Sequence, residues 1–144
     1  MIHRQLIDDL TEWSKRENHK PLVLRGARQV GKTTLIDEFS KQYDCYIKLN
    51  LEQSADAMAF SISDNVSEIF QYLCLQRKIV VDKNKRTLLF IDEIQNEPKA
   101  VGLLRYFYEE MPWLHIIAAG SRLQTLIKQR ISFPVGRVEC MSLR

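Results

Sequence analysis

The sequence Gly-Ala-Arg-Gln-Val-Gly-Lys-Thr occupies residues 26–33 and fits the pattern G-x-x-x-x-G-K-[ST]. A short apolar run at residues 22–24 precedes it, and apolar residues at helical spacing follow it from Thr34 onward. In such an order of strand, glycine-rich loop and helix, backbone N–H groups and the helix N-terminus attract phosphate oxygens. The stretch therefore predicts a phosphate-binding loop, the Walker A motif or P-loop, at the carboxyl end of a buried strand.

Each residue type in this loop has a chemical task. Gly26 allows a sharp turn away from the strand, and Gly31 allows the backbone to approach phosphate oxygens closely. Lys32 is expected to bridge the β- and γ-phosphates of ATP, and the Thr33 hydroxyl is expected to bind Mg²⁺. The residues expected to contact the nucleotide are Gly26, Arg28, Gln29, Val30, Gly31, Lys32, Thr33 and Thr34. For Arg28, a solvated surface position is the favoured alternative.

The composition is that of an ordinary globular protein. The chain has 144 residues, of which 45% are hydrophobic and 27% charged, which suits one domain with a substantial core. The net charge of +3 is too small to indicate a nucleic-acid-binding module by itself. No apolar run approaches the length of a membrane span, and residues 1–6 carry charges where a signal peptide needs an apolar segment. A cytoplasmic protein with no membrane association is therefore expected.

The cysteines and histidines show no metal-ligand spacing. Cys45, Cys74 and Cys140 are odd in number, far apart and embedded in apolar segments, so they are expected to be buried, reduced thiols. The three histidines are equally scattered along the chain.

Apolar periodicity in the rest of the chain predicts helices that alternate with strands. Asn65 with Glu68 resembles a capping box, and Pro98 suits the first turn of a helix. Helices are expected at about 2–18, 34–43, 65–74, 98–111 and 121–127, with one short helix in the polar segment 52–63. Strands are expected at about 22–24, 45–50, 87–91, 114–119 and 135–143. This alternation is typical of a parallel sheet between two layers of helices.

The apolar run at residues 87–91 ends in Asp92 and Glu93, a pattern typical of the Walker B motif. Asp92 is expected to hold Mg²⁺, directly or through water. Glu93 is expected to activate the attacking water as a general base. The P-loop, Asp92-Glu93 and Gly120-Ser121 all follow predicted strands, and ligands of parallel sheets bind at these carboxyl ends, so one site is expected to collect them.

Two further polar residues each have two interpretations. Ser121 is either a sensor that contacts the γ-phosphate or the attacking water, or the N-cap of the next helix, with Gln124 completing a capping box. Arg137, at the predicted fifth strand, is either an arginine finger for a neighbouring subunit's nucleotide or a surface arginine. The finger interpretation implies a homo-oligomer.

Four segments occur in one order along the chain: Leu-Arg-Gly-Ala-Arg-Gln-Val-Gly-Lys-Thr-Thr at 24–34, Phe-Ile-Asp-Glu-Ile-Gln at 90–95, Ala-Gly-Ser at 119–121 and Gly-Arg-Val at 136–138. Together they resemble the predicted ATPases of bacteria and archaea within the AAA+ superfamily. The resemblance implies an α/β fold, the three-layer αβα P-loop NTPase of the AAA+ (ASCE) type. It also implies a five-stranded, mostly parallel sheet in the order 5-1-4-3-2, with strand four between the P-loop and Walker B strands.

The chain departs from the family pattern at two places. Ala119 stands where relatives usually have threonine before Gly-Ser, which weakens the sensor assignment of Ser121. The chain also stops near the predicted fifth strand, so the family's helical lid, second sensor and C-terminal domain are expected to be absent. The resemblance covers residues from about 20 to the end. Together with the chain length and the helical spacing before residue 20, it predicts a single ATPase domain over residues 1–144, with an N-terminal helix in 1–20 and a nucleotide-binding core over 21–144.

The expected activity is Mg²⁺-dependent hydrolysis of ATP to ADP at the β–γ bond, coupled to an unknown protein or nucleic-acid partner. The main alternative is a nucleotide-dependent binding switch with little or no turnover, which the absent lid favours. A third hypothesis is a P-loop kinase. The adjacent pair Asp92-Glu93 argues against a kinase, because a water-activating glutamate suits hydrolysis better than transfer to an acceptor.

Overall fold

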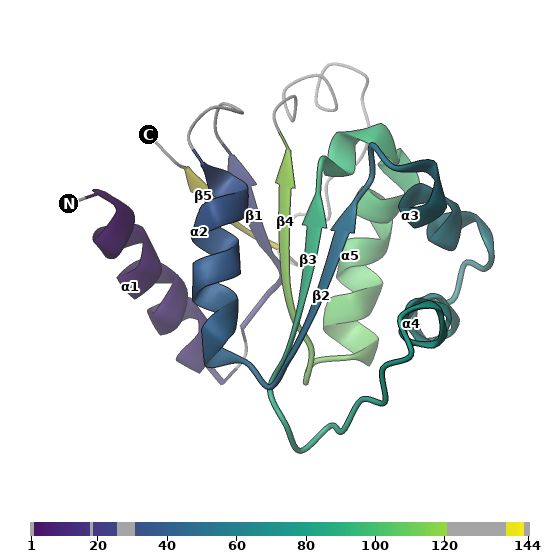
Figure 1. The fold of residues 1–144 in the computed structure, drawn as a ribbon, viewed down its shortest axis with the longest axis horizontal. Coiled ribbons are helices and arrows are strands. Elements are labelled where there is room, and N and C mark those ends of the chain that lie inside the picture. Colours follow the sequence, from purple (N-terminus) through teal and green to yellow (C-terminus); the bar gives the residue numbers. More distant parts are fainter. Residues whose placement is uncertain (1, 18, 26–30, 121–137, 143–144) are drawn as a thin grey trace.

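Helices and strands alternate along the chain, as the apolar spacing predicts (Figure 1). The computed structural model describes residues 2–17, 19–25, 31–120 and 138–142. The α-helices are α1 (Ile2–Lys15), α2 (Lys32–Phe39), α3 (Ser54–Met58), α4 (Val66–Gln76) and α5 (Pro98–Glu110). The strands are β1 (Leu22–Arg25), β2 (Cys45–Asn50), β3 (Thr87–Asp92), β4 (His115–Gly120) and β5 (Glu139–Ser142). Short 3₁₀ turns follow α2 at Ser40–Gln42, α3 at Ala59–Ser61 and β3 at Ile94–Asn96.

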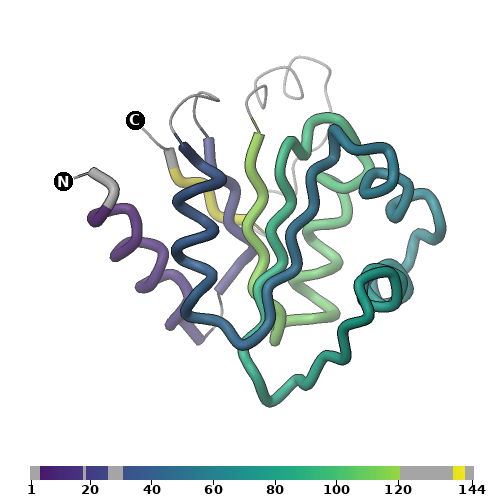
Figure 2. The backbone as a smooth tube through the Cα atoms, viewed as in Figure 1, coloured from purple at the N-terminus to yellow at the C-terminus, as the bar shows by residue number. Residues whose placement is uncertain are grey.

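The five strands form one sheet in the order β2-β3-β4-β1-β5, and every strand pair is parallel. This confirms the predicted order 5-1-4-3-2 and the predicted α/β class. The register places Asn50 opposite Asp92 and Arg25 opposite Gly120, so the carboxyl ends of these strands meet at one edge of the sheet. The backbone tube in Figure 2 shows that α2 also begins at this edge, next to the end of β1.

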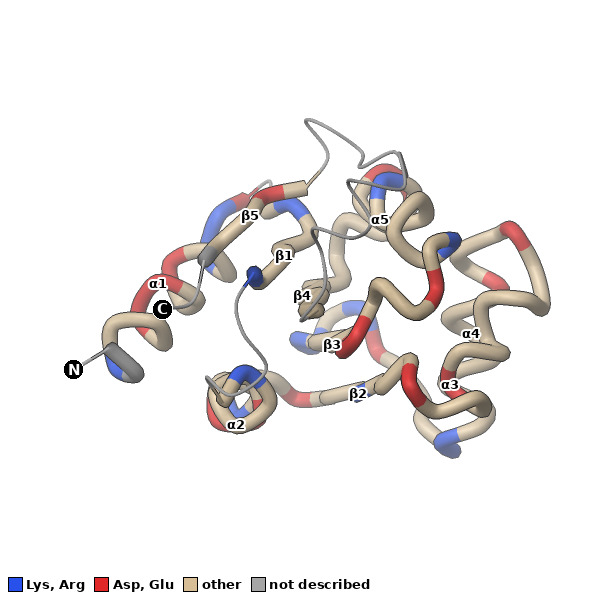
Figure 3. Tube along the Cα trace, turned by 90° about the horizontal axis from the view of Figure 1, so that it is seen from above, with Lys and Arg blue, Asp and Glu red and all other residues tan. Residues whose placement is uncertain are grey.

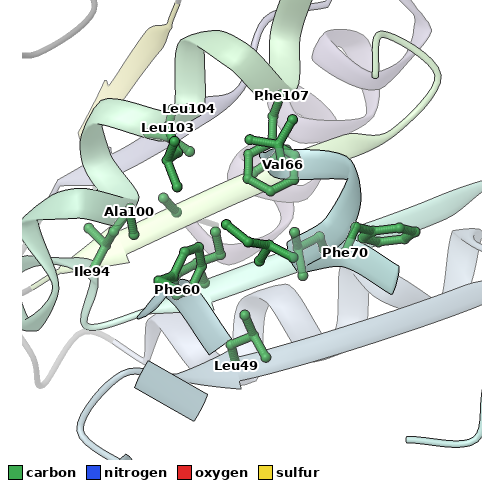
Figure 4. Close-up of a cluster of buried hydrophobic side chains, with 14 of the residues drawn as sticks. Leu49, Phe60, Val66, Phe70, Ile94, Ala100, Leu103, Leu104 and Phe107 are labelled. Carbon is green, nitrogen blue, oxygen red and sulfur yellow. The ribbon is translucent and has the colours of Figure 1, made fainter. Parts of the chain in front are cut away.

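The two faces of the sheet carry two separate hydrophobic cores, because side chains alternate between faces along each strand. Leu88 and Phe90 pack with residues of α1 and α2, whereas Leu89 and Ile91 pack with residues of α4 and α5. Seen from above in Figure 3, α2 lies on one side of the sheet and α5 on the other. Figure 4 shows part of the larger core, where Phe60 of the 3₁₀ turn at Ala59–Ser61 lies among side chains of α4 and α5. Since β3 is buried on both faces, its four central residues, 88–91, are all apolar.

The N-termini of α4 and α5 form where the sequence signals predict them, whereas the C-terminus of α4 forms without a predicted signal. The Asn65 side chain accepts a hydrogen bond from the Glu68 N–H at 3.1 Å, which confirms half of the predicted capping box, and Pro98 occupies the first turn of α5. Helix α4 ends in a Schellman motif, in which the Ile79 N–H donates to the Cys74 carbonyl at 2.9 Å. Lys78 takes the left-handed position of this motif, with φ of 56°.

Some predictions need correction. The expected burial of the cysteines is wrong: Cys140 is exposed on the edge strand β5, while Cys45 and Cys74 are half-buried. The fifth strand was expected over 135–143; β5 begins at Glu139, and residues 135–137 lie outside the described part of the chain.

Candidate functional site

The first turn of α2 is built on a glycine in a left-handed conformation. Gly31 has φ of 73° and ψ of 34° and is the N-cap of α2. A Cβ atom at this position would meet no other atom within 4 Å, so the requirement for glycine comes from the backbone conformation and not from space. The Gly31 carbonyl accepts the first helical hydrogen bond, from the Leu35 N–H at 3.0 Å, and Gly31 itself has no side chain that could cap the helix. The N–H groups of this first turn are therefore suited to an anionic ligand.

The two residues after Gly31 bring a cation and a hydroxyl to this position. Lys32 is the first residue of α2 and its side chain is only 5% exposed, which is unusual for a lysine. Thr33 is half-buried, and its Oγ1 atom donates a hydrogen bond to Oδ2 of Asp92 at 3.1 Å. This bond joins residues that are 59 positions apart and lie in the two predicted motifs.

Asp92 is the last residue of β3, and both of its carboxylate oxygens accept hydrogen bonds. Oδ2 accepts from Thr33, and Oδ1 accepts from the backbone N–H of Glu93 at 2.9 Å. The carboxylate is therefore held in one orientation at the carboxyl end of the sheet. A threonine hydroxyl and an aspartate carboxylate are hard oxygen ligands of the kind that Mg²⁺ prefers, so the residues present fit this ion.

Glu93 has a strained backbone. Its φ of 53° and ψ of 48° lie in the left-handed region, which costs a residue other than glycine about 1–3 kcal/mol. Its side chain is only 6% exposed. The next residue, Ile94, is 1% exposed and anchors the following 3₁₀ turn in the larger core. The fold thus stabilises a bend that places a buried carboxylate directly after Asp92.

Two polar side chains of β2, Tyr46 and Lys48, bind Asp37 of α2 and hold this helix against the sheet near the site. The Tyr46 hydroxyl donates to Oδ1 of Asp37 at 2.9 Å, and Lys48 Nζ lies 3.2 Å from both oxygens of Asp37. Burial, the neighbouring Asp37 and the charge of Asp92 all raise the pKa of Tyr46, so the hydroxyl stays protonated and remains a donor. These contacts hold the second turn of α2 against β2 and thereby support the contact between Thr33 and Asp92.

Six of the predicted site residues lie outside the described part of the chain, and a seventh is described. Gly26, Arg28, Gln29 and Val30 lie outside the described residues, as do Ser121 and Arg137. Thr34 is described, and its side chain is exposed on α2.

Two residues at the site were missed at the level of sequence. Tyr46 gave no signal, because it sits in an ordinary β-strand pattern and its partner Asp37 belongs to another element. Gln95 did give a signal, since it closes the Asp-Glu-Ile-Gln segment, but no role was inferred for it. Its Nε2 atom lies 3.4 Å from Oε1 of Glu93.

Two features are absent from the described residues. No cluster of three or more His, Cys, Asp or Glu side chains within those ranges is arranged to hold a metal ion. Among the same residues, no helix has both the length and the apolar character needed to cross a membrane.

Comparisons with solved structures show the same fold in other proteins. A Walker-type ATPase of Pyrococcus abyssi superposes with a TM-score of 0.58 at 18% identity, covering 95% of this chain and 51% of that one. The Drosophila origin recognition complex bound to DNA gives 0.60 at 14% identity, covering 99% and 91%. The Aeropyrum pernix Orc1 protein in complex with DNA gives 0.57 at 17% identity, covering 99% and 44%. This chain thus spans about half the length of the Pyrococcus ATPase.

Comparisons at the level of sequence identify the family. No curated protein matches this chain. A family model described as an AAA domain matches residues 18–144, which include the whole sheet and both Walker segments. The chain therefore belongs to the AAA domain family of P-loop ATPases.

Proposed function

We propose that this protein binds ATP together with Mg²⁺ at the carboxyl edge of its sheet and hydrolyses the bond between the β- and γ-phosphates. The observation that carries the proposal is the 3.1 Å hydrogen bond between Thr33 Oγ1 and Asp92 Oδ2. It brings together the two oxygen ligands that a P-loop ATPase uses for its metal, beside the buried Lys32 at the start of α2.

The proposed roles follow from position and chemistry. The first-turn N–H groups of α2 and the Lys32 ammonium bind and orient the β- and γ-phosphates. Thr33 and Asp92 hold Mg²⁺, which neutralises charge on the phosphate oxygens when it is bound. Glu93 accepts a proton from the attacking water, and its burial keeps bulk water away from the carboxylate. Gly26, Arg28, Gln29, Val30 and Thr34 complete the nucleotide contacts in this proposal.

The proposal extends to residues outside the described ranges. In the sequence Ser121 directly follows β4, a strand that ends at the same edge of the sheet as β3, so Ser121 is proposed to contact the γ-phosphate or the attacking water. Arg137 precedes β5, the edge strand next to β1. An arginine there is proposed to reach the nucleotide of a neighbouring copy in a homo-oligomer.

The domain assignment and the coupled partner are also proposals. Residues 1–144 are proposed to form one ATPase domain, because α1 contributes Leu10 and Trp13 to the same core as α2 and the sheet. Hydrolysis is proposed to be coupled to a protein or nucleic-acid partner. Two of the structural neighbours are described as bound to DNA, so nucleic acid is one partner class to test.

The test of this function compares the wild-type protein with Glu93→Gln. Phosphate release and ATP binding are measured with and without Mg²⁺, with no acceptor present. Glu93→Gln should keep ATP bound and slow hydrolysis about a hundredfold or more, the scale expected for loss of a general base. Glu110→Gln, which neutralises an exposed carboxylate at the end of α5, is the matched control and should leave the rate unchanged.

Two outcomes would contradict hydrolysis, and a third would contradict the role of Glu93. Tight binding of ATP by wild-type protein without phosphate release would favour a nucleotide-dependent binding switch. ADP formation that requires an added acceptor would favour a kinase. Equal rates in the wild-type protein and in Glu93→Gln would remove Glu93 from the reaction.

A further inference from the structure

The side chain of Gln95 contacts the carboxylate of Glu93 across the 3₁₀ turn that follows β3. Gln95 Nε2 donates to Glu93 Oε1 at 3.4 Å, near the long end of hydrogen-bond distances. A hydrogen bond of this length offsets little of the charge on the Glu93 carboxylate. Its main effect is on the direction in which the carboxylate points. The function proposed above gives Gln95 no role.

Chemistry fixes which end of the amide faces Glu93. An ionised carboxylate only accepts hydrogen bonds, so the NH₂ group of Gln95 must be the end that faces it. This orientation turns the other end, Oε1, into a buried position where it accepts no hydrogen bond from the described residues. A buried polar atom without a partner costs about 1–3 kcal/mol. Among the described residues, the Gln95 amide therefore makes its contact on the Glu93 side and none on the Oε1 side.

The backbone around the pair is held on both sides. Glu93 is in the left-handed conformation, and its carbonyl accepts from the Asn96 N–H at 3.1 Å. Between the pair, Ile94 is anchored in the larger core at 1% exposure. After the pair, Pro98 begins α5. The distance between the two side chains is therefore set by the fold and not by a flexible loop.

We propose that Gln95 is a positioning residue for Glu93, holding the carboxylate through its amide in the direction needed to take a proton from the attacking water. The inference rests on the proposed hydrolysis. Gln95 acts through Glu93, so its removal should affect turnover and leave nucleotide binding intact. A catalytic group that is misplaced by about 1 Å can lose about 100-fold in rate, which bounds the effect.

The test is a double-mutant cycle of Gln95→Met and Glu93→Gln, read by single-turnover phosphate release from ATP with Mg²⁺. Methionine has nearly the same length and shape as glutamine but no donor, so packing at this half-buried position is conserved. Gln95→Met should lower the rate about 10- to 100-fold with unchanged ATP affinity. In the Glu93→Gln background the same substitution should cause no further loss. Gln71→Met, at an exposed glutamine on α4, is the matched control.

The outcomes separate this inference from the function on which it rests. A wild-type rate in Gln95→Met, with Glu93→Gln impaired, overturns the positioning role alone. An equal loss in both backgrounds also overturns it, because Gln95 would then support the fold independently of Glu93. Loss of ATP affinity or of thermal stability in Gln95→Met would likewise overturn the positioning role. Equal rates in the wild type and in Glu93→Gln would overturn the general-base role of Glu93 and this inference together, whereas no phosphate release by the wild type would overturn the proposed hydrolysis itself.

Discussion

A buried histidine should make the stability of this protein fall steeply in mild acid. His115 begins β4, between the strands that carry the two Walker motifs, and is 8% exposed. The Tyr43 hydroxyl hydrogen-bonds its Nδ1 atom, the His19 ring lies 3.9 Å away between centroids, and the Trp13 ring lies 5.7 Å away. Burial, followed by the nearby charges of His19 and Arg86, lowers the pKa of His115 from 6.5 to about 3.

The sign and size of the effect follow from this difference in pKa. In the unfolded chain His115 takes up a proton below about pH 6.5, whereas in the folded protein it stays neutral until about pH 3. Between these values the unfolded state binds more protons, so stability is lost as the pH falls. At about pH 5 the loss relative to neutral pH is about 2 kcal/mol, a large part of a typical 5–15 kcal/mol.

Urea unfolding at about pH 7.5, 6 and 5 measures this loss, and His115→Gln isolates its cause. Glutamine offers the Tyr43 hydroxyl a polar partner but does not titrate. The pH-dependent loss should therefore be about 2 kcal/mol smaller in the variant than in the wild type. An NMR titration of the His115 ring should show no protonation in the folded protein at about pH 5. Equal pH dependence in both proteins, or a ring that titrates near 6.5, would refute the reasoning.

Three further predictions concern the site and the scaffold. Thr33→Ala and Asp92→Asn should each weaken ATP binding more in Mg²⁺ than in EDTA, and equal losses in calorimetric titrations under both conditions would assign both residues to the fold. Lys78→Gly should stabilise the protein by about 1 kcal/mol in urea unfolding, because φ of 56° suits glycine, and destabilisation would contradict the Schellman assignment. If Arg137 acts on a neighbouring copy, ATPase activity per subunit should rise with protein concentration, and Arg137→Ala should abolish that rise while leaving ATP affinity unchanged. Mixing Arg137→Ala with Lys32→Ala should restore activity, and no rescue in mixed assemblies would make Arg137 a surface residue.

The motifs were predictable from sequence because each position in them has one chemical task. The contact between Thr33 and Asp92 is expected from their shared ligand alone, and the structure places the two side chains 3.1 Å apart. The strand order, in contrast, was not predictable from the residues themselves. Spacing along the chain does not tell that β4 lies between β1 and β3, and that expectation came from the family resemblance.

Contacts between distant residues outside any motif were not predictable. His19 and His115 gave no spacing signal, yet the parallel sheet brings their rings together at the amino end of β4. Lys78 adopts the left-handed conformation that glycine usually takes after a helix. Because no glycine stands there, the end of α4 carried no sequence signal. Cys140 was expected to be buried because its segment is apolar, but an edge strand leaves part of its surface uncovered.

The most direct test of the central claim is a calorimetric titration of the wild-type protein and of Lys32→Ala with ATP in Mg²⁺. Lys41→Ala, which removes an exposed lysine after the end of α2, is the matched control. The wild type and the control should bind ATP with equal affinity. Lys32→Ala should bind at least about tenfold more weakly, since a hydrogen bond to a charged group contributes about 1.5–3 kcal/mol. Unchanged affinity in Lys32→Ala, or no ATP binding by the wild type, would contradict a nucleotide site at the start of α2.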